Sequence, residues 1–318
     1  MRLHLLGLVA VYGMGSLACA TEHKLLPAGG FISTLGREQP LVGRIWDCAR
    51  GAYSTSDELL SAVAHARFLA LGETHDNPDH HVLQAELLQQ FLATHAQPAV
   101  GFEMLDEDQA ALLAAHPAAS SDALASTVNW DASGWPRFAL YRPLFDAAFA
   151  ARARIVATHP SSEHVRASMA GPSAGEARSL ALDTPLPAAQ REAQREEIRV
   201  SHCGHAPEAM LTAMQNAQQY KDAFMARSMF QTHAAAALIT GRGHARKDRG
   251  VPLYMRRLGV SATLSVGFVD VDATHTRARD YETTAFDFLV FTPRVTDLDP
   301  CQQFKQQLET LRHDASAN

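Results

Sequence analysis

Residues 68–75 read Phe68-Leu69-Ala70-Leu71-Gly72-Glu73-Thr74-His75, an apolar run that gives way to ionisable residues. Three later apolar runs, at 99–102, 155–158 and 236–240, lead in the same way to Glu103, His159 and His244. Short apolar runs that are bounded by turn residues and separated by helical segments are typical of buried parallel strands. The sequence therefore predicts an α/β fold with a mostly parallel central sheet flanked by helices.

Ligands of such sheets bind beyond the carboxyl ends of the strands. If the four strands are neighbours, their terminal residues point into one crevice. The pattern Gly-x-x-His occurs at both Gly72 and Gly241, but a chain with 19 Gly and 16 His should contain about one copy by chance. The alternative is that these are separate, hydrogen-bonded loop residues. A shared site is favoured because each of these residues follows the end of a predicted strand. The residues are Glu73, His75, Glu103, His159 and His244.

The first residues resemble a secretory signal, because Arg2 precedes an apolar run that ends on small residues. Cleavage after Ala20 fits ordinary signal peptidase, whereas Ser16-Leu17-Ala18-Cys19 resembles an imperfect lipobox. We slightly favour the second alternative. The expectation is an exported protein, either periplasmic or an outer-membrane lipoprotein anchored at Cys19.

The 318 residues are 47% hydrophobic, enough to bury a full core, and carry a net charge of −6. This charge argues against nucleic acid as a partner. In an oxidising compartment two of Cys48, Cys203 and Cys301 are expected to pair, and the spacing alone does not choose the pair.

The segments divide the chain into a core with one inserted part. We expect a signal peptide at 1–20, a flexible tether at 21–41, core at 42–160 and 233–301, and a C-terminal helix and tail at 302–318. Residues 161–232 contain no convincing strand and predict a smaller helical subdomain inserted into the core.

Five motifs stand out in the chain. They are Leu71-Gly72-Glu73-Thr74-His75-Asp76-Asn77-Pro78-Asp79-His80-His81, Gly101-Phe102-Glu103-Met104, His202-Cys203-Gly204, Lys221-Asp222-Ala223-Phe224-Met225-Ala226, and Gly241-x-Gly-His244-Ala-Arg-Lys-Asp-x-Gly-Val-Pro252. Together they resemble the motifs of the ChaN-like haem-binding uptake family of the Tiki superfamily. The resemblance extends from about Gly43 to Cys301, and the first and last motifs are long enough to be specific.

The resemblance implies an exported, often lipidated protein that handles haem during iron acquisition. It implies a disulfide between Cys203 and Cys301, and it carries over His75 and His244 as paired histidines. Partners expected on this basis are haem, an outer-membrane haem receptor or a periplasmic haem carrier, and a second copy of the chain around haem. Family haem binding by a tyrosine suggests Tyr141 as the iron ligand, since tyrosinate oxygen binds haem iron elsewhere.

Two functions from different classes use the same crevice. In the first, haem binds with Tyr141 or a histidine on iron, and basic residues near His244 meet the propionates. In the second, a Tiki-like peptidase or esterase holds a divalent metal, and a glutamate acts as general base. We favour haem binding. The haem-contacting candidates are His75, Tyr141, His159, His244, Arg246 and Arg249; the metal candidates are His75, His244 and Glu73; the catalytic candidates are Glu73 and Glu103.

Overall fold

The computed structural model describes residues 25–115, 117–299, 301–302 and 305. An eight-stranded sheet forms the centre, in the order β2-β1-β8-β7-β3-β6-β4-β5. The pairs β3–β6, β3–β7, β4–β5, β4–β6 and β7–β8 are parallel, while β1 runs antiparallel to β2 and β8. The mostly parallel sheet predicted from the sequence is confirmed. The strands are β1 (Ile45–Asp47), β2 (Ala52–Ser54), β3 (Phe68–Glu73), β4 (Ala99–Asp106), β5 (Arg154–His159), β6 (Ala236–Gly241), β7 (Thr263–Asp270) and β8 (Phe288–Thr292).

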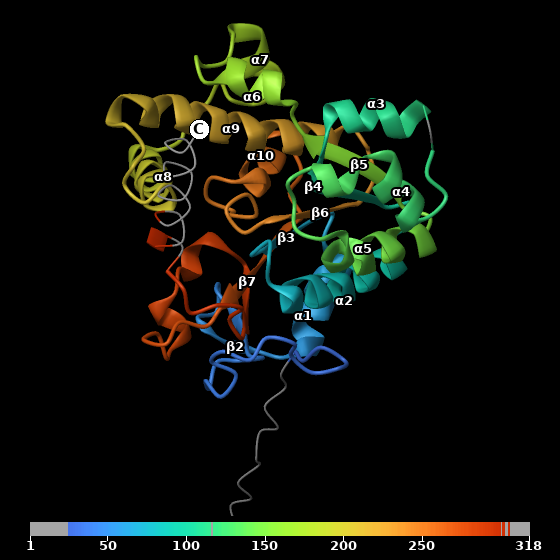
Figure 1. The fold of residues 1–318 in the computed structure, drawn as a ribbon, viewed down its shortest axis with the longest axis vertical. Coiled ribbons are helices and arrows are strands. Elements are labelled where there is room, and N and C mark those ends of the chain that lie inside the picture. Colours follow the sequence, from blue (N-terminus) through green and yellow to red (C-terminus); the bar gives the residue numbers. More distant parts are fainter. Residues whose placement is uncertain (1–24, 116, 300, 303–304, 306–318) are drawn as a thin grey trace, which may run out of the picture.

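Helices cover both faces of this sheet (Figure 1). One apolar core includes residues of α1, α2 and α5, and the other includes residues of α9 and α10. Because both faces are covered, all six residues of β3 and of β6 are buried, as their continuous apolar runs predict. The helices are α1 (Ser56–His65), α2 (Pro78–Thr94), α3 (Glu107–Ala115), α4 (Ser121–Thr127), α5 (Phe138–Ala150), α6 (Ser162–Ser168), α7 (Ala174–Ser179), α8 (Ala188–Ser201), α9 (Glu208–Phe230) and α10 (Val251–Arg257), with short 3-10 turns at Trp130–Ala132, Ala278–Asp280 and Thr283–Ala285.

Capping residues fix where the first helices begin. Thr55 and Glu58 form a reciprocal capping box at α1. At α2 the Asn77 side chain accepts a hydrogen bond from the Asp79 N–H, and Pro78 occupies the first turn. Both helices therefore begin within a few residues of the strand that precedes them. Helix α2 begins at Pro78, shortly after His75.

The segment at 25–41 differs from the tether expected there. Leu25 and Leu41 are buried, and the Asp79 carboxylate accepts hydrogen bonds from the backbone N–H groups of Ile32 and Ser33, at 2.6 and 2.9 Å. A carboxylate at the start of α2 thus holds a loop that looks unstructured by composition. The signal peptide and Cys19 lie outside the described residues, as does most of the C-terminal helix and tail expected at 302–318. Among the described residues, no helix is both long and apolar enough to cross a membrane.

Between β5 and β6 the chain forms only helices, α6 to α9. A disulfide joins Cys203, just after α8, to Cys301, with their Cα atoms 5.4 Å apart. The disulfide implied by the family resemblance is therefore present, and Cys48 is left as a free thiol.

Candidate functional site

The carboxyl ends of β3, β6 and β4 bring the predicted residues together, because these strands are adjacent in the sheet. Nε2 of His244 lies 3.3 Å from Oε1 of Glu103. Gly241, at the end of β6, lies directly under the His75 ring. A Cβ placed on Gly241 would lie 3.0 Å from Cε1 of His75 and 3.7 Å from Oε2 of Glu103. The two Gly-x-x-His turns thus meet on one side of the sheet, as the shared-site interpretation predicts.

Glu103 is held in place by the end of β6. Its Oε2 accepts hydrogen bonds from the Thr240 hydroxyl at 2.6 Å and from the Gly241 N–H at 2.7 Å. Burial opposes ionisation of Glu103, but the charge and hydrogen bond of His244 outweigh burial and hold its pKa well below the usual range. Glu103 is therefore a fixed, ionised carboxylate at neutral pH.

His244 lies between two buried carboxylates. Its Nδ1 donates to Oδ1 of Asp222 on α9 at 2.6 Å, and its Nε2 faces Glu103. Burial disfavours the charged imidazole, but the charges of Glu103 and Asp222 outweigh burial and raise the pKa of His244 to about 9. A doubly protonated imidazole has no lone pair to offer a metal. The metal role predicted for His244 would require one ring nitrogen to lose its proton, and it stays a prediction.

His75 pairs with Glu73 at the end of β3. Its Nδ1 lies 2.7 Å from Oε1 of Glu73, whose side chain is fully buried, while 39% of the His75 side chain is exposed. Burial lowers the pKa of His75, but the Glu73 hydrogen bond and charge outweigh burial and raise it overall. The His75 ring also packs edge-on against Trp135, with centroids 4.9 Å apart. His75 is thus the exposed member of a buried charge cluster.

Tyr141 is in the core and does not reach the crevice as an iron ligand would. Its side chain is 0% exposed, packs on Trp130 and His81, and donates a long 3.5 Å hydrogen bond to Glu73. Burial and then the nearby carboxylates raise its pKa far above the ordinary value, which opposes the tyrosinate that binds iron. Tyr141 is carried by the inward face of α5 and contacts the site through Glu73, and its role as an axial ligand stays a prediction.

His159, at the end of β5, lines a hollow of about 380 Å³. Its Nδ1 donates to the Pro160 carbonyl at 2.7 Å, so the neutral ring carries its lone pair on Nε2. Burial lowers the pKa of His159, which keeps the ring neutral. This is the form in which imidazole binds metals. The other lining residues are Glu103, Met104, Asp106, Gln109, Ser133, Gly134, Trp135 and Ser162.

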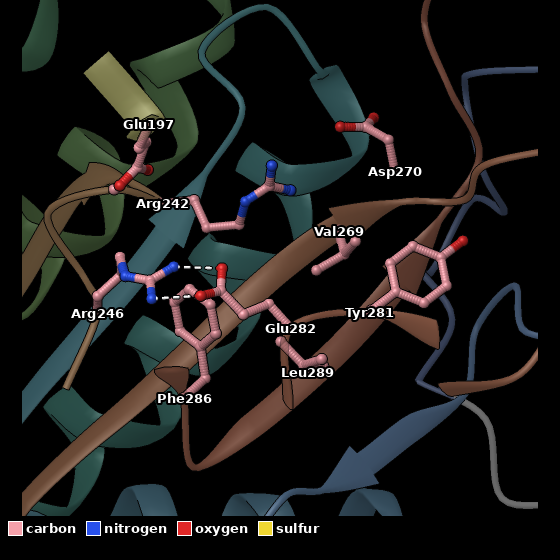
Figure 2. Close-up of a pocket in the computed structure, with 10 residues that line it drawn as sticks. Glu197, Arg242, Arg246, Val269, Asp270, Tyr281, Glu282, Phe286 and Leu289 are labelled. Carbon is pink, nitrogen blue, oxygen red and sulfur yellow. Dashed lines mark hydrogen bonds and ion pairs between the residues drawn. The ribbon is translucent and has the colours of Figure 1, made fainter. Parts of the chain in front are cut away.

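The two arginines predicted to meet propionates are both buried and already paired. Arg246 forms paired hydrogen bonds with Glu282 (Figure 2) and also with Asp248. Arg249 pairs with Asp248 and with Glu197. These carboxylates neutralise the cations that the sequence suggested for a ligand.

Sequence reasoning missed Arg242, which extends into a second cavity of about 260 Å³ on the β7 side of the same turn (Figure 2). Its only described side-chain hydrogen bond is a 3.4 Å contact from Nη1 to the Phe268 carbonyl. No ion pair joins it to a carboxylate of the described residues. Arg242 is thus a cation near His244 that no carboxylate of the described residues pairs with.

Asp222 was the other residue without an assigned role. It lies 22 residues before His244, on a helix expected only as part of the inserted helical subdomain, and only its place in the Lys221-to-Ala226 motif singled it out. Within the described residues, no group of three or more His, Cys, Asp or Glu side chains has an arrangement suited to a metal ion. The predicted ligands instead bind one another in pairs.

A family model described as "Haem-binding uptake, Tiki superfamily, ChaN" matches residues 59–255, which is more than half of the chain. The chain belongs to this family. The match spans every strand end that forms the site, from Glu73 to His244. Haem-related uptake is therefore the functional class in which this ChaN-family chain falls.

A solved structure of a family member has the same fold. It is described as "Cofacial heme binding to ChaN of Campylobacter jejuni" and superposes with a TM-score of 0.63 at 18% identity, covering 77% of this chain and 95% of that one. The type III effector HopBA1 superposes with a TM-score of 0.44 at 12% identity, covering 74% of this chain and 92% of that one. Erythromycin esterase EreC superposes with a TM-score of 0.37 at 12% identity, covering 78% of this chain and 81% of that one. Among curated proteins there is no match.

Proposed function

We propose that this chain binds haem for uptake in the hollow beside Glu103, with Nε2 of His159 as the iron ligand. The observation that carries the proposal is the His159 tautomer. The Pro160 carbonyl fixes the proton on Nδ1, and burial keeps the ring neutral, which leaves a lone pair on Nε2 in a residue that lines the hollow. Haem when bound supplies an iron that accepts such a nitrogen ligand.

The walls of the hollow suit a flat aromatic ligand. Trp135 and Met104 both line it, and an indole ring and a thioether make favourable contacts with a macrocycle. The volume of about 380 Å³ is near the lower end for small-molecule sites, so part of a porphyrin would extend beyond the hollow. A second copy of the chain would cover the extending part. Cofacial haem binding is described for ChaN of Campylobacter jejuni, and it supports a homodimer around haem as part of this proposal.

Arg242 takes the propionate role in this proposal in place of Arg246 and Arg249. A propionate at Arg246 or Arg249 would compete with Glu282, Asp248 or Glu197, whereas Arg242 has no such carboxylate to displace among the described residues. Charge-assisted contacts of this kind add affinity without touching the iron.

The compartment belongs to the same proposal. Export would place the protein where haem arrives from an outer-membrane receptor or a periplasmic carrier, and lipid attachment at Cys19 would hold it at a membrane. The sequence features at Arg2 and Cys19 support this part. Labelling with radioactive palmitate in cells, with Cys19→Ala as the control, tests the anchor.

A haemin titration of the purified mature protein tests the site. His159→Ala should shift the Soret band and weaken binding, because it removes the iron ligand. His65→Ala, which changes an exposed histidine on α1, is the matched control and should leave the spectrum unchanged. Arg242→Ala should lower affinity without moving the band. An unchanged spectrum in His159→Ala refutes the ligand, and no saturable binding by the wild type refutes the proposal as a whole.

The hydrolase alternative is supported by one feature, the exposed His75 whose Nδ1 is held by buried Glu73. A carboxylate that orients a histidine and stabilises its protonated form suits a general base. The predicted version in which His75, His244 and Glu73 hold a metal is less well supported, because His244 has both nitrogens directed at carboxylates. Ester or peptide cleavage that is lost in both Glu73→Gln and His75→Ala would establish this alternative.

A further inference from the structure

The amino ends of the strands, opposite the candidate site, carry a charge pattern that haem binding does not use. Five short segments lead into β3, β4, β5, β6 and β7, and none contains Asp or Glu. The segments are residues 64–68, 93–99, 149–154, 227–236 and 254–263, and together they contain six Arg and three His. A wholly basic set of loops is unexpected in a chain with a net charge of −6.

Four of these basic residues line a hollow of about 600 Å³ at the amino ends of β3, β6, β4 and β5. They are Arg67, His95, Arg154 and His233, from four loops that are distant in sequence. The remaining lining residues are the neutral Thr94, Ala96, Gln97, Thr232, Ala234 and Ala235. The hollow therefore contains donors and positive charge from several directions and no carboxylate to neutralise them.

The hydrogen bonds leave this charge available. Nη2 of Arg67 donates to the His233 carbonyl at 2.9 Å, which ties two of the loops together. The Arg154 side chain is exposed and has no hydrogen bond or ion pair with any described residue. Arg67 thus holds two of the loops in place, and Arg154 is free to contact a ligand.

Two residues that line the hollow have an unusual backbone conformation. Gln97 and His233 have φ angles of 50° and 58°, in the left-handed region that favours glycine after a helix. Both positions hold a long polar side chain that lines the hollow. A need for good helix ends alone would favour glycine there.

Helix dipoles explain part of the pattern. Helices α1, α2, α5 and α9 end at this face, and basic residues stabilise helix carboxyl ends. That effect acts within the last turn of each helix. It does not explain why residues from four loops surround one hollow, or why two of them occupy positions suited to glycine.

We propose that this basic hollow binds a phosphoryl group, carried by a small phosphate ester or by the headgroup of an anionic phospholipid. The donors of the hollow come from four loops, and a tetrahedral oxyanion can accept hydrogen bonds from several directions. The guanidinium group of arginine is also well suited to binding phosphate. A hollow of about 600 Å³ is larger than the phosphoryl group alone requires, so an attached glycerol or sugar also fits.

Two probes distinguish the sources of the phosphoryl group. Glycerol 3-phosphate, titrated by calorimetry, represents a free ester, and co-sedimentation with phosphatidylcholine vesicles with and without phosphatidylglycerol represents a headgroup. Arg154→Glu should weaken whichever probe binds by at least about fivefold, because it reverses one charge at the site. Arg178→Glu reverses an exposed arginine on α7, outside the hollow, and is the matched control.

His233→Gly separates binding from folding. Glycine suits the φ of 58°, and the carbonyl that Arg67 uses is retained, so the variant should melt no lower than the wild type while binding the probe more weakly. Binding of only one probe identifies the source and supports the site. The proposal is overturned if the wild type binds neither probe, or if Arg154→Glu and Arg178→Glu weaken binding equally. Neither result bears on haem.

Discussion

Asp222, His244 and Glu103 form a buried charged group that makes the stability of the protein depend on pH. The dependence falls at neutral to alkaline pH, above the range in which carboxylates ordinarily titrate. The pKa of His244 is raised to about 9 in the folded protein, against about 6.5 for an ordinary histidine. A group whose folded pKa is raised contributes stability that is fully present below its unfolded pKa. That contribution is lost as pH rises through the folded pKa. The window for His244 therefore runs from about pH 6.5 to just above 9.

The size of the effect follows from the same shift. Each pKa unit corresponds to about 1.4 kcal/mol, so the difference between about 6.5 and about 9 gives roughly 3 kcal/mol. Burial raises the pKa of Asp222 and outweighs the attraction of His244, so the desolvation of that carboxylate lowers stability throughout the window. We expect a loss of roughly 3 kcal/mol in the free energy of unfolding across the window, from the titration of His244.

Urea denaturation at a series of pH values, followed by tryptophan fluorescence, measures this loss. His244→Gln is the matched variant, because its amide fills the site without titrating. The wild type should lose stability from pH 6.5 to 9.5, and the variant should show a much flatter curve while being less stable at low pH. Parallel curves for the two proteins would refute the assignment of His244 as a buried imidazolium.

Three further outcomes follow from single contacts. Tyr141→Phe should leave the haemin spectrum unchanged, because the hydroxyl is buried; a shifted Soret band would restore the axial-tyrosine interpretation. Gly241→Ala should weaken haemin binding several-fold, because its Cβ would lie 3.0 Å from His75, and a haemin titration unchanged from the wild type would contradict this. Cys203→Ser should reduce the free energy of unfolding in urea without reductant by about 2–4 kcal/mol, since the disulfide closes a 98-residue separation; an equal value in the two proteins would show that the disulfide contributes nothing.

The strands and the crevice were predictable because their causes are local. A continuous apolar run predicts a strand buried on both faces, and parallel strands place their carboxyl ends at one edge. The two Gly-x-x-His turns meet for this reason. The order of the strands was not predictable, because β6 enters between β3 and β4 after more than a hundred intervening residues.

Charge pairing was the part that sequence reasoning could not supply. Arg246 and Arg249 looked available because Glu282 and Glu197, which pair with them in addition to the neighbouring Asp248, are distant in sequence. Tyr141 looked available because a helix pattern does not say which face packs against the sheet; in the structure it packs under Glu73. Most of these contacts join segments that only the folded chain brings together.

The candidate site and the basic hollow lie at opposite ends of the central strands. Glu73 and Glu103 lie at the carboxyl ends of β3 and β4, where their buried charges hold two histidines. The segments that lead into β3, β4, β5, β6 and β7 contain arginine and histidine and no acidic residue. Helix dipoles favour each sign at the end where it occurs, since helices begin after the carboxyl ends of the strands and finish before the amino ends. The fold therefore stabilises an acidic site and a basic site at opposite edges of one sheet, and substitution at one edge should leave binding at the other unchanged.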